Sequence, residues 1–470
     1  MKITFLICFI SGWGSYLFSQ ERLGISNSNY SPTNSIYLNP SSTVDSRTYM
    51  QINMAGLNAY VKTNMGYIPS FSLRNLATVA EPIQKETVRK QFLHAGGSVE
   101  GLSFTISKRD YGAGFFIRAR SVIDTRRVPF ELSTMMLRGS FFNSSSNVDI
   151  VGRDFSNAKF STMTWVEYGL NFGKMIKRSR NTLITLAGNL KYNIGINMAY
   201  ADLIRFKSYN YGGASLGVDE LKAVYKQTDF LWKAGRGFGL DIGFTYKKML
   251  DYIESYYANS TRSNCKYVDY RYKIGLAMRD AGYIRFTKGN PTIIKAEGSG
   301  FMNPNTQDTT FASALQVSFN STTQNPNAIW SSLPTALTGQ FDYNVDNYLY
   351  LNVSVIKNLV PNRLTGVQSQ DLISFCPRYE FMQFEAALPL TFQRFVYPQI
   401  GLALRYRSFV IGVDNIIPVI VKVNTNGLGV YCSLAISLFR NPACETPDKR
   451  VDDCQQFKSG KNKITRKKRK

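Results

Sequence analysis

The chain has 470 residues, 19% of them charged, and its 56 Lys and Arg against 32 Asp and Glu give a formal net charge of +24. The chain has a single His, which argues against a histidine-based zinc site. After the N-terminus it has no run of about 18 apolar residues, which argues against a second helical membrane span. Proteins with such a positive net charge often bind nucleic acid or anionic lipid. The export signal described next argues against nucleic acid as a partner.

Residues 1–19 have the pattern of a secretory signal peptide. Lys2 is followed by an apolar run over residues 3–18, and the small residue Ser19 precedes Gln20 as a cleavage point. A buried hairpin or an uncleaved anchor is the alternative. We expect export to the cell outer membrane, with cleavage after Ser19.

Five cysteines remain after such cleavage, and an odd number leaves at least one of them without an intramolecular partner. Cys444 and Cys454 lie close together in a polar segment, which predicts a small disulfide loop in an oxidising compartment. Two unlinked thiols are the alternative, and the pairing of Cys265, Cys376 and Cys432 stays open.

Long stretches of the chain alternate between apolar and polar residues. In residues 181–200, NTLITLAGNLKYNIGINMAY, the apolar side chains are Ile184, Leu186, Leu190, Tyr192, Ile194, Ile196, Met198 and Tyr200. The same period of two recurs over residues 98–108, 165–173, 239–249, 272–279, 399–407 and 427–439. Alternation places one face of a strand against an apolar environment and the other against a wet one.

These strands predict a closed antiparallel transmembrane β-barrel over residues 48–439, because no unpaired sheet edge can face lipid. We expect about 14 strands, with 12 or 16 as alternatives and a soluble sandwich as the competing fold. In the last strand, residues 427–439, alternate side chains from Val430 to Leu438 should face lipid. Aromatic residues at strand ends suit the membrane interfaces: Tyr200, Tyr246, Tyr348, Tyr350 and Tyr406.

The lengths of the connections between strands predict one end of the barrel with short turns and one with long loops. Short turns are expected at residues 108–112, 177–181, 346–347 and near 408, and long loops at 207–230 and 288–333. Residues 81–93 break the alternation and predict a short helix in a loop or in the lumen.

One segment resembles a known group of barrels. Asn39–Pro40–Ser41 resembles the Asn-Pro-Ala element that opens FadL-type fatty-acid channels and the related shuttle barrel of type IX secretion. Residues 23–56, 234–248 and 405–418 are similar to an uncharacterised family of outer-membrane barrels from bacteria that use type IX secretion. The resemblance implies a barrel of about 14 strands with residues 20–47 inside or beneath it, and it transfers no binding site.

No catalytic constellation accompanies these strands. The one histidine, His94, is interpreted as a loop or interfacial residue rather than a general base, and no Gly-x-Ser-x-Gly element surrounds a serine. Gly235–Gly239 (GRGFG) runs into a strand rather than a helix, so we interpret it as small lumen residues and not as a nucleotide loop. We therefore expect no enzyme, no metal and no cofactor.

Charged residues at inner positions are the candidate site of the lumen. They are Arg118, Arg120, Glu167, Lys191, Asp241, Arg279, Arg405 and Arg407. Such residues form either an anion-selective pore or Arg–carboxylate pairs that fill the barrel.

The segment 440–470 contains 11 Lys and Arg against four Asp and Glu, and we expect it to be a periplasmic tail. Its basic end consists of Lys458, Lys461, Lys463, Arg466, Lys467, Lys468, Arg469 and Lys470. This end either binds an acidic periplasmic or secretion-system protein or peptidoglycan carboxylates, or only keeps the chain soluble.

The leading hypothesis is a non-enzymatic outer-membrane barrel, embedded in outer-membrane lipid, that serves as a structural or accessory partner of an envelope or secretion assembly. The alternatives are a FadL-like transporter or channel for small hydrophobic or anionic molecules, and a secreted soluble β protein.

Overall fold

The computed structural model describes residues 22–72, 83–84, 91–129, 153–154, 156–211, 215–253, 258–259, 268–302, 316, 319–346, 348–394 and 397–439. The expected signal peptide, Cys265, the Cys444–Cys454 pair and the basic end of the tail all lie outside these residues. Within the described residues, no helix is both long enough and apolar enough to span a membrane.

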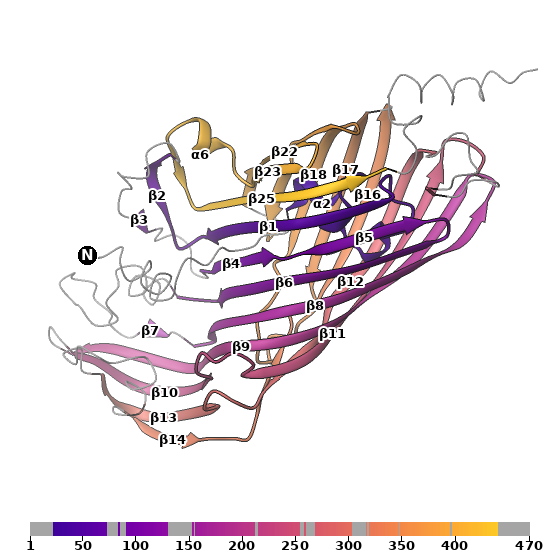
Figure 1. Cartoon of the computed structure of the whole chain (residues 1–470). Helices are drawn as coiled ribbons and strands as arrows, with labels where there is room; N and C mark the ends of the chain where they lie inside the picture. Colours follow the sequence, from indigo (N-terminus) through magenta and orange to yellow (C-terminus); the bar gives the residue numbers. More distant parts are fainter. Residues whose placement is uncertain are drawn as a thin grey trace, which may run out of the picture.

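The chain forms one closed antiparallel barrel of 14 strands (Figure 1), which confirms the predicted fold class and strand number. Pairing of β1 with β25, from Met50 opposite Leu438 to Lys62 opposite Gly427, closes the sheet. Around the barrel the strands are β1 (Met50–Thr63), β4 with β5 (Leu93–Glu100, Ser103–Lys108), β6 (Tyr111–Arg126), β8 (Ala158–Ser179), β9 (Thr182–Tyr211), β11 (Gly235–Met249), β12 (Tyr270–Phe286), β15 with β16 (Ile329–Ser332, Ala336–Asp346), β17 (Leu349–Asn358), β18 (Leu372–Glu380), β19 with β20 (Phe384–Ala387, Leu390–Gln393), β21 with β22 (Tyr397–Ile400, Leu402–Tyr406), β23 (Phe409–Val413) and β25 (Gly427–Leu438).

The alternation of the sequence sorts side chains between the outer and inner faces of the wall. In β9, Leu186 and Leu190 are exposed on the outside, whereas Asn189 and Lys191 are buried inside. In β25, Leu434, Ile436 and Leu438 are likewise exposed. The barrel therefore carries an apolar outer belt around a polar interior.

A β-bulge interrupts this alternation in the middle of β9. Thr164 pairs with Asn197 but Trp165 pairs with Gly195, so Ile196 is an extra residue. A shift of one residue moves every following side chain to the other face. Met198 and Tyr200 are consequently buried inside the barrel, and their predicted lipid-facing positions were wrong.

Tyr350, also expected at a membrane interface, is fully buried in the interior. Its hydroxyl contacts Arg47 of the N-terminal segment and Asp269, which keeps this ring on the inner face of β17. Tyr406 is 60% exposed on the outer face, as expected for an interfacial aromatic residue.

The barrel has a turn end and a loop end. The short connections predicted near residues 109, 180, 346 and 408 all lie at the turn end, where both β1 begins and β25 finishes. Residues 359–371 and 414–426 are longer connections at the loop end, whereas residues 250–269, between β11 and β12, connect two strands at the turn end.

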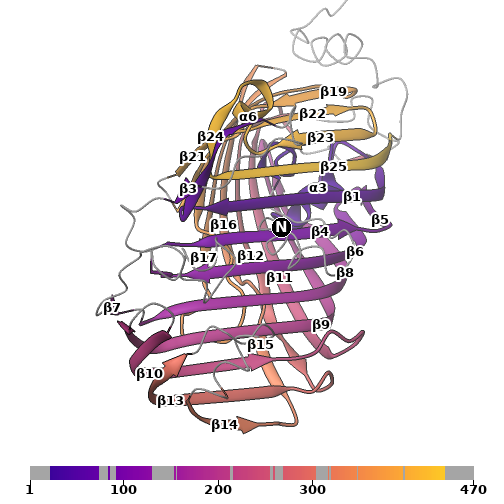
Figure 2. The same ribbon diagram turned by 90° about the vertical axis from the view of Figure 1, so that its left-hand side faces the viewer.

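The sheet continues past the loop end as an extension. The second half of β9 pairs with β10 (Ser215–Gln227), β10 pairs with β13 (Thr292–Met302), and β13 pairs with β14 (Asn320–Gln324). Figures 1 and 2 show these strands beyond the barrel wall, beside β7 (Arg153–Asp154). Leu203, Phe206, Leu221, Ile294 and their neighbours give the extension a small apolar core.

A small sheet of β2 (Gly66–Phe71), β3 (Ile83–Gln84) and β24 (Val423–Thr425), with α6 (Ile417–Ile420) beside it, completes the loop end. The helix predicted over residues 81–93 is wrong where the structure describes that segment. Ile83–Gln84 is a strand that pairs with β2, and Leu93 begins β4, so strand pairing overrides the helical spacing of the apolar residues.

Residues 22–47, hereafter the plug, lie inside the barrel. The plug contains α2 (Leu23–Ser26), α3 (Pro32–Ser35) and the 3₁₀ turn η1 (Pro40–Thr43), and Figures 1 and 2 show α2 and α3 between opposite walls. Its apolar side chains pack on the wall at separate places: Leu23 and Leu38 with Ala336 and Ile356, Ile25 with Tyr431, and Val44 with Ala187. The plug is thus part of the packed interior.

Candidate functional site

The Asn39–Pro40–Ser41 motif docks the plug into the wall. The Asn39 side chain caps η1 by accepting from the Ser41 N–H at 3.1 Å. Its amide donates to the Phe244 carbonyl at 3.3 Å, to Thr245 Oγ1 at 3.2 Å and to Gln340 Oε1 at 3.2 Å.

Two wall glycines make room for this contact. A Cβ atom on Gly243 would lie 2.2 Å from Asn39 Oδ1 and 2.7 Å from Pro40 Cδ, and one on Gly275 would lie 2.8 Å from Asn39 Nδ2. The absence of side chains on β11 and β12 lets the backbone of the plug approach closely. We name Asn39, Pro40, Gly243 and Gly275 the latch.

Ion pairs hold both ends of the plug. Near its start, Arg22 pairs with Glu100 of β4 and donates to Asn34 at 2.8 Å; Arg22 is 5% and Glu100 2% exposed. Near its end, Asp45 accepts from Lys247 at 2.7 Å, and Arg47 pairs with Asp269 at 2.6 Å. Charges this deeply buried are tolerated because each one faces an opposite charge.

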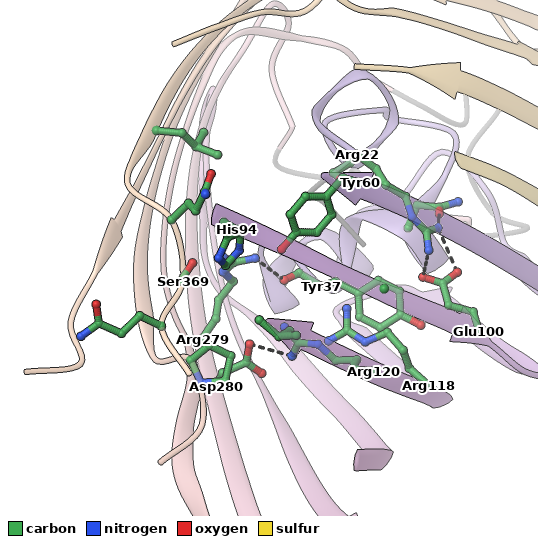
Figure 3. A pocket seen from close by; sticks show the side chains of 18 residues that line it. Arg22, Tyr37, Tyr60, His94, Glu100, Arg118, Arg120, Arg279, Asp280 and Ser369 are labelled. Carbon is green, nitrogen blue, oxygen red and sulfur yellow. Dashed lines mark hydrogen bonds and ion pairs between the residues drawn. The ribbon is translucent and has the colours of Figure 1, made fainter. Parts of the chain in front are cut away.

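A cavity on the loop side of the plug, hereafter the chamber, has about 60 Å³ of space open to water-sized molecules (Figure 3). Figure 3 shows Arg22, Arg118, Arg120 and Arg279 around it, with Tyr37 of the plug at the centre of the group. Its remaining lining includes Tyr60, His94, Glu100, Asp280 and residues 368–370. The lining is polar and rich in arginine.

A second cavity, with about 40 Å³ of space open to water-sized molecules, lies toward the turn end. It is lined by plug residues together with Thr245, Lys247, Lys273 and Gln340. Ser26 lines both cavities. The plug therefore separates two polar spaces on opposite sides of itself.

The wall of the chamber contains a network of six buried charges. Glu167 accepts from Arg118 Nη2 at 2.9 Å and from Arg120 Nη1 at 2.8 Å. Asp280 pairs with Arg120 at 2.9 Å and with Lys191, and Lys191 also pairs with Asp241 at 2.6 Å. Three cations thus face three carboxylates, which matches the arrangement of Arg–carboxylate pairs rather than a ring of uncompensated positive charge.

Of the residues predicted to line the lumen, the structure brings Arg118, Arg120, Glu167, Lys191 and Asp241 together in this network. Arg279 is buried beside it and donates to the Tyr37 carbonyl at 3.1 Å, so it contacts the plug directly.

The last two predicted lumen residues lie elsewhere. Arg405 is buried on the far wall, where it donates to Glu385 at 3.0 Å. Arg407 is exposed in the turn between β22 and β23 and lies over the Tyr406 ring, so it does not line the interior. Its φ of 50° shows that the strand alternation has ended before it.

Sequence reasoning missed Arg22, Glu100 and Asp280 as members of the site. Asp280 continues the apolar series Ile274, Leu276, Met278, so strict alternation would point this carboxylate at lipid, where charge is costly. That conflict was a usable signal of a bulge. In the structure Leu240 pairs with Ala281 but Ile242 with Met278, and the shift turns Asp280 inward.

The single histidine is part of the chamber wall and not of a loop. His94 lies in β4 with its Nδ1 3.3 Å from Asp124 Oδ1, and its ring stacks on Tyr60 with centroids 5.3 Å apart. No serine, threonine or cysteine of the described chain hydrogen-bonds its ring. Within the same described residues no group of three His, Cys, Asp or Glu is arranged to hold a metal. Cys376 and Cys432 are both free thiols.

Tyr37 and Asp414 both lie outside the spanning strands and have shifted pKa values. Burial raises the pKa of Tyr37 in the plug, and nearby Glu100 raises it further, so the phenol is neutral. The Tyr37 ring lies under Arg118, whose Cζ is 4.1 Å from the ring centroid. At the loop end, burial raises the pKa of Asp414 to about 7; the residue is half-buried, but its Oδ2 is fully covered and has no hydrogen-bond partner.

A closed 14-stranded barrel with an apolar outer belt and a polar lumen occupied by an N-terminal plug defines the protein as an outer-membrane β-barrel of the plugged class. The chain belongs to DUF5723, a family of unknown function whose sequence profile matches residues 40–414. No curated protein matches it in sequence.

Several solved barrels are similar in structure at low identity. The TodX deltaS2S3 mutant monoaromatic hydrocarbon channel is 9% identical over 91% of this chain and 96% of its own, with a TM-score of 0.39. A Pseudomonas aeruginosa FadL homologue is 7% identical over 91% of this chain and 100% of its own, with a TM-score of 0.23. The translocator domain of the autotransporter NalP from Neisseria meningitidis is 6% identical over 83% of this chain and 88% of its own, with a TM-score of 0.30.

Proposed function

We propose that this protein is a closed, non-enzymatic outer-membrane barrel that serves as a structural or accessory partner of an envelope or secretion assembly. The observation that carries the proposal is the plug. It is latched to the wall at Asn39, ion-paired near both ends and packed through Leu23, Ile25, Leu38 and Val44, which supports a lumen that stays closed.

The loop-end extension supports a role in assembly. A barrel that only anchors a chain needs no sheet beyond the membrane, whereas β10, β13 and β14 form a surface there with its own apolar core. The tail adds a second surface in this proposal, through a Cys444–Cys454 disulfide and the basic residues from Lys458 onward, which would bind an acidic periplasmic partner or peptidoglycan. The type IX secretion apparatus is the first assembly to test, given the resemblance of residues 23–56.

Export in this proposal uses the signal peptide, so the mature protein would begin at Gln20, two residues before the plug begins at Arg22. Mass spectrometry of the protein purified from membranes measures this directly. A mature chain that still contains residues 1–19 would contradict the export step.

Two measurements on the full-length protein test closure and partnership separately. In planar bilayers we expect the wild-type barrel to be silent, and steady conductance would refute closure. In affinity purification from cross-linked membranes we expect deletion of residues 455–470 to reduce recovery of a specific co-purifying protein. Unchanged recovery would remove the tail from the proposal and leave the loop-end extension as its remaining surface.

A second candidate function is a channel for small anionic molecules, and the arginine-rich lining of the chamber favours it. The same lining argues against small hydrophobic cargo, because an apolar solute would strip water from charged groups without replacing their hydrogen bonds. Proteoliposome uptake that is faster for small anions than for neutral solutes of equal size, and that falls in Arg279→Gln, would favour this candidate over the first.

A further inference from the structure

Two arginines oppose each other on the outer face of the barrel near the loop end. Arg236 of β11 pairs in register with Arg285 of β12, and both side chains are exposed. Opposed residues on neighbouring antiparallel strands have Cα atoms about 4.5–5.5 Å apart. Figure 1 shows these two strands side by side in the wall.

The charges of this pair are not compensated by the protein. Within the described residues no carboxylate pairs with either guanidinium, and the next residues across the sheet are Ile194 and Trp330. Lys233 and Lys288, both exposed in the adjoining loops, add positive charge. The acidic residue of these loops, Asp229, accepts a hydrogen bond from Asn290 at 2.6 Å. Like charges directly opposed across two strands destabilise a sheet, so this arrangement calls for an external anion.

An aromatic row marks the depth of the pair relative to the membrane. One row closer to the middle of the barrel, Tyr192, Phe238 and Tyr283 lie on the outer face, with Tyr192 and Phe238 5.6 Å apart between ring centroids. Exposed Leu240 follows below them. Aromatic rows of this kind lie at the membrane interface, and the next row along a strand is about 7 Å further out. The guanidinium groups therefore lie at the level of lipid headgroups.

We propose that Arg236 and Arg285 bind the phosphate of a lipid headgroup in the leaflet on the loop side. Guanidinium groups bind phosphate oxygens through two parallel hydrogen bonds, and two of them side by side match one phosphate group. Trp330 holds Arg285 in place, since the Arg285 Cζ lies 5.6 Å from its ring. The inference rests on residence of the barrel in the outer membrane and is independent of its partner role.

The turn end offers a matched control. Arg271 is an exposed residue at the turn end of the same strand, β12, and its Cζ lies 5.8 Å from the Tyr343 ring. It has the same stacking on an aromatic ring, but its register position places no second arginine opposite it.

The test is native mass spectrometry of the full-length barrel in detergent with graded amounts of lipid A, a glycolipid that carries phosphate, or of the same lipid with its phosphates removed. We expect the wild type and Arg271→Gln to bind lipid A equally. The double variant Arg236→Gln/Arg285→Gln should bind at least tenfold more weakly. The wild type should bind the lipid without phosphate as weakly as the double variant binds lipid A. In a separate measurement, free inorganic phosphate at equal concentration should not displace lipid A from the wild type.

A second variant removes the charge conflict instead of the charge. Arg285→Glu should pair with Arg236, raise the midpoint of thermal unfolding in lipid-free detergent and abolish the further rise that lipid A gives to the wild type. Equal lipid A binding by the double glutamine variant, or equal binding of the lipid without phosphate, would overturn the proposal. Full displacement by free phosphate would overturn the lipid as the ligand.

Discussion

Substitution of Gly243 by alanine should open the latch. The new Cβ atom would lie 2.2 Å from Asn39 Oδ1, 2.7 Å from Pro40 Cδ and 3.0 Å from Pro40 N. The Asn39 amide can rotate away, but the proline ring is rigid, so the 39–40 segment has to move off the wall.

The cost follows from the contacts that leave with this segment. The two N–H groups of the Asn39 amide are shared among Phe244, Thr245 and Gln340. The Ser41 hydroxyl adds a third hydrogen bond to the wall, 2.6 Å from Thr245 Oγ1. At about 1 kcal/mol for each bond, the docking free energy of the plug falls by about 3 kcal/mol. That change raises the undocked fraction of the plug roughly 100-fold.

Single-channel recording in planar bilayers measures this change. The wild type should be closed and Gly243→Ala should show openings on the order of 100 times more often. Gly339→Ala is the matched control in β16, because a Cβ there meets nothing nearer than Leu276 Cδ2 at 3.9 Å. If Gly243→Ala were as silent and as heat-stable as this control, the latch would not hold the plug.

Three further experiments test the buried charges. Arg22→Met should lower the free energy of unfolding by about 3–5 kcal/mol because it leaves Glu100 buried without its partner, and the added change Glu100→Leu should restore most of the loss in urea titrations. Arg378→Met, at a fully buried site 3.0 Å from a carboxylate, should cost a similar 3–5 kcal/mol, whereas Lys357→Met, in an exposed pair, should cost less than about 1 kcal/mol; equal losses would refute the role of burial. With its pKa raised from 3.8 to about 7, Asp414 is neutral in the folded barrel while it is ionised in the unfolded chain, so it lowers stability progressively as pH rises from about 4 to about 7. The thermal midpoint of Asp414→Asn should therefore exceed that of the wild type by an increasing amount over that pH range. A difference that does not change with pH would contradict the raised pKa of Asp414.

Much of the wall could be predicted from local pattern. Alternation over residues 239–249 and 427–439 identified the strands and their outer faces, because a period of two is a property of the extended backbone itself. It also placed Arg118, Arg120, Glu167, Lys191 and Asp241 inside, although it assigned none of their pairings.

The inward positions of Met198, Tyr200 and Asp280, which strict alternation assigned to the outer face, share one cause. A bulge at Ile196 turned Met198 and Tyr200 inward, and a second bulge turned Asp280 toward Lys191. Pairing with the neighbouring strand and packing in the interior decide where a bulge forms. The sequence of one strand indicates a bulge only indirectly, for example by an acidic residue in an apolar series.

By its own sequence this chain determined that it forms a barrel, which face of most strands meets lipid, and which end has the short turns. Tertiary structure alone decided that the Asn39–Pro40 segment enters a slot between Gly243 and Gly275, and that Arg22 finds Glu100. The physical reason is that alternation acts within one strand, whereas a docked plug and a balanced charge network depend on residues that only closure of the sheet brings together.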